Sequence, residues 1–130
     1  MIDSPVMRAV HHLAIVVADL ARAEQFWVEV VGLPVERRWD DDHGRPRSVW
    51  LSLDRGFLAL ERAGTSGNPR DDAAPGLHCV ALAIGREERA AWEARLAAAG
   101  VPIERKSPYT LYVRDPDGTL VGLSHWPEPV

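Results

Sequence analysis

The sequence predicts an α+β fold in which two βαβββ modules form a curved mixed sheet around a central cavity, with the helices on the outer face. Two repeats predict this architecture: "HHLAIVV" at 11–17 returns as "HCVALAI" at 78–84, and "GLPVERR" at 32–38 returns as "GVPIERK" at 100–106. A chain of 130 residues has the size of one ordinary domain. The repeats are therefore expected to be the two halves of a single domain spanning 1–130.

The first module is expected over about 7–63. Residues 8–18 have apolar and β-branched side chains at both odd and even positions, which favours a strand covered on two faces. Asp19 is a typical helix N-cap, and Gly32 is a typical residue to end that helix. Strands are expected over 33–39, 47–53 and 57–63, with turns between them. The helix residues at core spacing are Leu20, Ala23, Trp27, Val30 and Val31.

The second module, about 76–126, is expected to repeat this order after a linker at about 64–75. The linker is rich in Gly, Pro and Asp and has no periodicity. A strand is expected over 77–84 and a helix over about 86–99. Three further strands are expected over 101–106, 109–114 and 119–125, with the turn "DPDG" at 115–118 before the last one.

Composition excludes several classes of partner. The hydrophobic fraction of 46%, the charged fraction of 26% and the net charge of −4 are ordinary for a globular protein and give no basic surface for nucleic acid or an anionic membrane. The single cysteine excludes an intrachain disulfide, and the first residues lack the pattern of a signal peptide. We therefore expect a cytoplasmic protein with no nucleic-acid or membrane partner.

The segments "HHLAIVVADLARAEQFWVEVVGLPV" at 11–35 and "LYVRDPDGTLVGL" at 111–123 resemble the vicinal oxygen chelate superfamily, which contains glyoxalases, bleomycin-resistance proteins and extradiol dioxygenases. The resemblance implies where a divalent metal would be held: by a His on the first strand of each half and a carboxylate on the last strand of each half. Carried onto this chain, those positions are His12, Cys79, Gly122 and, if Gly56 is aligned with Gly118, Leu60.

Glu61 lies one residue beyond that last position. Because side chains alternate across a strand, we expect Glu61 to face the helix side unless a bulge redirects it. His12, Glu61 and Cys79 are the best remaining metal ligands, for Zn, Ni, Mn or Fe, but we favour a protein that needs no cofactor. By the same alternation His11 and His78 are expected to point toward the helices.

Side chains that face the cavity are predicted to line a small-molecule pocket. Strand parity and the aromatic content of the sheet select His12, Ala14, Trp50, Cys79, Ala81, Tyr112, Gly122 and Ser124. Most of these are small and leave space, although the tryptophans and tyrosines of the sheet could equally fill it. Arg47 and Arg114 would contact an anionic ligand if they flanked the pocket, but a surface role is favoured.

The favoured function is a metal-independent protein that binds an apolar or aromatic small molecule, or confers resistance by doing so, and we expect it to form a homodimer. The alternative is a metal-dependent lyase, isomerase or dioxygenase with a rearranged site centred on His12. No residue is assigned a catalytic role. The sequence leaves open whether the modules pair within one chain or across a dimer.

Overall fold

The computed structural model describes residues 4–68 and 70–130. Its first half forms a four-stranded sheet in the order β1-β4-β3-β2. The strands are β1 (His12–Val17), β2 (Val35–Asp40), β3 (Pro46–Ser52) and β4 (Phe57–Arg62), and β1 is followed by α1 (Leu20–Glu24) and the π-helix η1 (Gln25–Val30). β1 pairs with β4 in parallel, and the other neighbours are antiparallel.

The second half forms a sheet of the same topology, in the order β5-β8-β7-β6. Its strands are β5 (Cys79–Ala83), β6 (Arg105–Lys106), β7 (Thr110–Arg114) and β8 (Leu120–Ser124), and β5 is followed by η2 (Arg86–Glu88) and α2 (Arg89–Ala98). β5 pairs with β8 in parallel, as β1 does with β4. The predicted α+β class with two βαβββ units is therefore confirmed.

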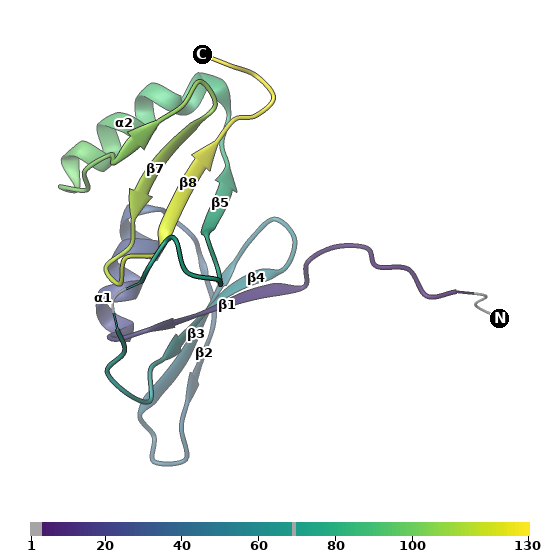
Figure 1. Cartoon of the computed structure of the whole chain (residues 1–130). Coiled ribbons are helices and arrows are strands. Elements are labelled where there is room, and N and C mark those ends of the chain that lie inside the picture. The colour runs from purple at the N-terminus through teal and green to yellow at the C-terminus, as the bar shows by residue number, and fades with distance from the viewer. Residues whose placement is uncertain (1–3, 69) are drawn as a thin grey trace.

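The helices lie on the same side of the two sheets, at the left in Figure 1, and the sheets do not close into a barrel. One apolar core joins the two halves beneath these helices. Its members are buried residues of both sheets, of α1 and η1, and of α2, and they include Ile15, Trp27, Leu60, Leu96 and Val121. Each sheet buries one face in this core, and the other face of each sheet is not packed against the helices.

The first helix differs from the expected regular helix. After five α-helical residues it continues as a π-helix, in which Val31 N donates to Phe26 O. A wider turn changes which side chains face inward. Phe26, which α-helical spacing did not select, is consequently buried, whereas Val30 is only half-buried.

Among the described residues, no helix is both long and apolar enough to cross a membrane.

Candidate functional site

Each sheet has one face packed on the helices and one face without them, which we call the open face. In the first sheet Ile15, Val17 and Leu60 belong to the buried core. The alternate residues of β1 and their partners on β4 must therefore lie on the open face. These are the pairs His12 with Phe57, Ala14 with Ala59 and Val16 with Glu61.

The second sheet presents the equivalent positions. Val80, Val121 and Leu123 belong to the core, so Cys79, Ala81 and Ala83 lie on the open face with their β8 partners Leu120, Gly122 and Ser124. Trp50 pairs with Ala59, and Tyr112 pairs with Gly122. The eight residues expected to line the pocket thus lie on the open faces, three of them on the first sheet and five on β5, β7 and β8. Their binding of a ligand stays a prediction.

Glu61 corrects the expected strand register. It pairs with Val16 and accepts a hydrogen bond from the hydroxyl of Ser48 (3.0 Å), so it lies on the open face, and the expectation that it faces the helices is wrong. Leu60 is instead fully buried in the core. The turn before β4 is one residue shorter than the turn before β8, so aligning their glycines displaced the comparison by one residue.

The pairing of the strands identifies the true counterpart of Gly122 as Ala59. His12 lies beside Phe57 and Cys79 beside Leu120, and the counterpart positions two residues further along β4 and β8 are Ala59 and Gly122. Of the four positions at which the resemblance places metal ligands, two therefore have no side-chain donor. The residues present do not fit that ligand set.

The alternative metal ligands, His12, Glu61 and Cys79, do not form a metal site either. Glu61 is four residues along β4 from the partner of His12, which is about 13 Å at 3.3 Å per residue. Within residues 4–68 and 70–130, no three His, Cys, Asp or Glu side chains are arranged to hold a metal ion. Cys79 is half-buried, and nothing in the described chain brings it to Glu61.

A row of stacked rings crosses the open face of the first sheet. The ring centroids of His12 and Phe57 are 4.6 Å apart with an angle of 2° between the planes, and those of Phe57 and Trp50 are 4.3 Å apart at 22°. Trp50 in turn lies 5.2 Å from Trp39. The planes of Trp50 and Trp39 are tilted by 59°, and the row uses one residue from each of the four strands, so it forms a continuous aromatic strip in which His12, Phe57 and Trp50 pack face to face.

The sequence analysis did not select Phe57, although the alternation of side chains along β4 places it on the open face, opposite His12. It also missed His11, whose Nδ1 lies 2.9 Å from Nδ1 of His12 and whose ring centroid lies 5.8 Å from that of Phe57. His11 and His78 are both exposed. The expectation that His11 points toward the helices is wrong because β1 begins only at His12, so strand alternation does not govern His11.

The charged groups beside the open face are partly neutralised. Arg114 pairs with Asp72 and Glu104 (2.9 Å for the Glu104 contact), and these hydrogen bonds raise the pKa of Arg114 above its ordinary value. The hydrogen bond from Arg114 also lowers the pKa of Asp72. Arg114 is therefore occupied by its own chain, as a structural surface residue would be. Arg47 is exposed.

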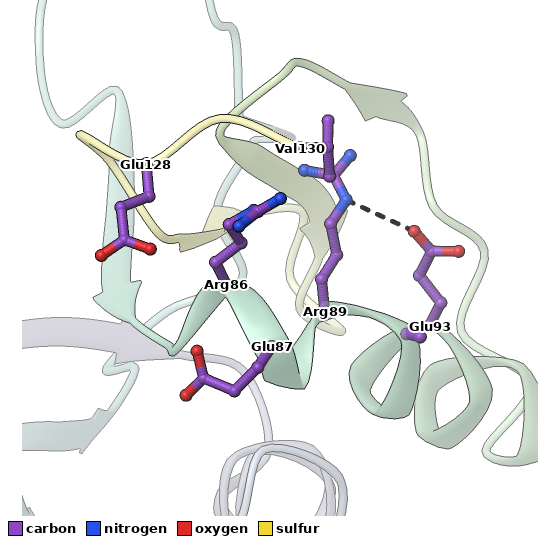
Figure 2. A pocket seen from close by; sticks show the side chains of 7 residues that line it. Arg86, Glu87, Arg89, Glu93, Glu128 and Val130 are labelled. Atoms are coloured by element: carbon purple, nitrogen blue, oxygen red, sulfur yellow. Dashed lines mark ion pairs between the residues drawn. The ribbon is translucent and has the colours of Figure 1, made fainter.

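A surface cavity of about 450 Å³ lies elsewhere, between α2 and the segment after β8. Figure 2 shows Arg86, Glu87, Arg89, Glu93 and Glu128 around it. Arg89 is buried, pairs with Glu93 (3.5 Å), donates to Ser107 O (3.0 Å) and contacts His125 Nε2 (2.9 Å). These contacts use the hydrogen-bonding groups of Arg89 and hold the segment after β8 against α2. The charged residues around the cavity therefore have a structural role.

Known structures share this fold over nearly the whole chain. Glyoxalase I of Leishmania major, described as trypanothione-dependent, is 27% identical with a TM-score of 0.70, covering 92% of this chain and 87% of that chain. A lactoylglutathione lyase from Agrobacterium tumefaciens is 24% identical with a TM-score of 0.70, covering 93% and 96%. The fosfomycin resistance protein FosX of Listeria monocytogenes is 16% identical with a TM-score of 0.73, covering 92% of both chains.

Another structure of the Listeria protein contains Mn(II) and sulfate, which is a property of that protein. A comparison with curated protein sequences found no match. The family model for the Glyoxalase/Bleomycin resistance protein/Dioxygenase superfamily, however, matches residues 9–123. With the duplicated βαβββ topology, this match shows that the chain belongs to the Glyoxalase/Bleomycin resistance protein/Dioxygenase superfamily.

Proposed function

We propose that this protein binds an apolar or aromatic small molecule on its open face without needing a metal. The observation that carries the proposal is the row of rings formed by His12, Phe57, Trp50 and Trp39. The rings pack face to face within the row, so a flat aromatic ligand lying over it would meet ring edges, and edge-to-face packing is a geometry that aromatic pairs favour. Ala14 and Ala59 pair beside Trp50, and Ala14 is exposed while Ala59 is buried.

Metal independence is supported by the shortage of side-chain donors at the four positions where the resemblance to the superfamily places metal ligands. Ala59 and Gly122 cannot bind an ion, and His12 and Cys79 alone are fewer than the three protein ligands that catalytic zinc sites typically use. The alternative, a metal-dependent lyase, isomerase or dioxygenase, is supported by His12 at the first-strand position and by the imidazole of His11 2.9 Å from it.

A homodimer would complete the site. His12, Ala14, Ala81 and Ala83 are exposed in the single chain, and Val16 is 57% exposed. Apolar groups on an open sheet face gain free energy when a second surface covers them. A second copy is the partner we propose.

The ligand proposal predicts that planar aromatic compounds raise the melting temperature and quench tryptophan fluorescence. Trp50→Ala removes the centre of the row and should weaken binding about tenfold, since stacking contributes roughly 1 kcal/mol or more. The control is Trp92→Phe, because Trp92 lies on α2, away from the open face. Failure of a broad panel of flat compounds to bind the wild-type protein would contradict the proposal.

The metal proposal predicts a metal-to-protein ratio near zero when tag-free protein is exposed to nickel, zinc, manganese or ferrous iron and then desalted. Elemental analysis gives the ratio directly. A ratio near one that falls in His12→Ala would instead support the metal-dependent alternative and direct attention to the pair His11 and His12.

A further inference from the structure

The two halves carry an arginine at equivalent places on their open faces. Arg37 and Arg105 occupy the same position in the repeated segments 32–38 and 100–106. Arg37 pairs with Trp50 across β2 and β3, and Arg105 pairs with Tyr112 across β6 and β7. Both arginines therefore share a face with an aromatic residue of the neighbouring strand.

A local irregularity redirects each arginine to this face. Val35 packs against the core, and regular alternation would place Arg37, two residues later, on the same side. The register shifts between Val35 and Arg37, so Arg37 reaches the open face instead. In the second half Ile103 likewise packs against the core, whereas Arg105 pairs with Tyr112.

Each guanidinium lies over a ring. The Cζ atom of Arg37 is 3.8 Å from the centroid of the Trp39 ring, and the Cζ atom of Arg105 is 4.3 Å from that of Tyr112. Stacking on a ring fixes the plane of a guanidinium while leaving the N–H groups at its edge free to bind a carboxylate in a bidentate manner.

Within the described residues, no ion pair uses these donors. The ion pairs among residues 4–68 and 70–130 involve neither Arg37 nor Arg105. The next residues in the two segments, Arg38 and Lys106, are instead paired with Glu24 and Glu93 near the helices. Within the described chain, Nε1 of Trp39 is also buried without a hydrogen-bond partner beside Arg37. A buried donor of this kind calls for an acceptor.

From this duplicated arrangement we infer that the ligand is an organic anion, with a flat apolar body that packs on the open-face aromatic residues and a carboxylate that the arginine of that face binds, Arg37 on the first sheet or Arg105 on the second. The inference rests on the proposed function and names the ligand class. On the first open face the carboxylate of Glu61 is hydrogen-bonded to Ser48. On the second, Asp72 and Glu104 pair with Arg114, and Arg105 is only the smallest of the causes that lower the pKa of Asp72.

The test compares naphthoate with naphthamide, which has the same shape and no charge, by tryptophan fluorescence titration at low and high salt. We expect naphthoate to bind at least tenfold more tightly than naphthamide, and the preference to decrease as salt screens the charges. In the double variant Arg37→Gln/Arg105→Gln the preference should disappear while naphthamide binding is unchanged, which also shows that the variant is folded.

The matched control is Arg38→Gln/Lys106→Gln, which removes the same charge from the same two segments on the helix side and should keep the preference. Arg37→Lys/Arg105→Lys should retain part of it, because an ammonium keeps the charge and loses bidentate geometry. Equal binding of the two probes, or a preference that survives Arg37→Gln/Arg105→Gln, overturns the anion inference alone. If neither probe nor any other flat compound binds, the proposed function fails with it.

Discussion

Gly122 shows how a single position decides the chemistry of the open face. It is buried, and a Cβ there would lie 3.2 Å from Cγ2 of Thr110 and 3.4 Å from Cβ of Ala81. The first distance is shorter than an ordinary contact between carbon atoms. A larger residue, including a carboxylate that would restore a metal ligand, can therefore be accommodated only if Thr110 moves.

We predict that Gly122→Ala lowers the free energy of unfolding by about 1 kcal/mol because of this overpacking. Adding Thr110→Ser should recover most of the loss, since serine removes Cγ2 and keeps the hydroxyl that bonds to Ser124 (2.8 Å). Urea unfolding of the two single variants and the double variant measures the coupling. Additive effects of the two substitutions would show that Thr110 is not the obstacle.

At the scale of elements, the turn between β2 and β3 is organised by Asp41. Its carboxylate accepts hydrogen bonds from the backbone N–H of Arg45 (2.9 Å) and His43 (2.8 Å), and it pairs with Arg62 of β4 (2.9 Å). The backbone N–H of Arg45 and then the guanidinium of Arg62 lower the pKa of Asp41 to about 2. Asp41 therefore holds the turn between β2 and β3 together and ties it to β4.

This pKa predicts the acid behaviour of the hairpin. Because the folded-state value lies below the ordinary 3.8, ionised Asp41 stabilises the fold above about pH 4, and this contribution disappears as the pH falls toward 2. Asp41→Asn should be less stable than wild type at pH 6, and the difference should shrink as the pH is lowered through this range. Urea unfolding at each pH gives the difference, and Asp42→Asn controls for the loss of one charge. A pH-independent difference would contradict the assignment.

Two elements differ from what the local sequence predicts. The strand expected over 101–106 is reduced to Arg105 and Lys106, because Val101 N donates to Leu96 O at the end of α2 and so belongs to the helix terminus. The π-helix after Glu24 has no signature in the apolar spacing, since α-helical and π-helical turns bury overlapping sets of residues. Here packing against the sheet, rather than intrinsic propensity, selects the backbone conformation.

At the scale of the molecule, polar contacts bind the two halves together. Arg95 of α2 donates to Val30 O (2.7 Å) and Glu29 O (3.1 Å) at the end of η1. Asp115 accepts from Nε1 of Trp27 (3.4 Å), and burial raises the pKa of this carboxyl. Because the halves also share an apolar core, they are expected to unfold together.

We predict that Arg95→Met destabilises the protein by about 1 kcal/mol, since it leaves two carbonyls at the end of a helix without these donors. Fluorescence and circular dichroism should still report one coincident transition. Arg86→Met is the control, because Arg86 is exposed and has no ion pair within the described chain. Two separate transitions would show that the halves are independent folding units.

The open-face site was only partly predictable. His12, Cys79 and Gly122 could be placed from the repeat, because each lies on a strand whose parity is clear from its own apolar residues. Glu61 and Ala59 could not, because their placement depends on the length of a turn and on pairing with a distant strand. The sequence analysis did not select Arg37, because a register shift between Val35 and Arg37 places it on the face opposite to the one that regular alternation predicts.

The sequence by itself determined the duplicated βαβββ order, the α+β class and the residues of β1 and β5 that face away from the helices. These follow from repeats and from periodicity, which are local properties of the chain. Only the tertiary structure decided that Ala59 is the counterpart of Gly122, that Glu61 shares a face with His12, and that Arg37 and Arg105 lie over aromatic rings. The physical reason is that strand register and bulges are set by pairing between segments far apart in the sequence.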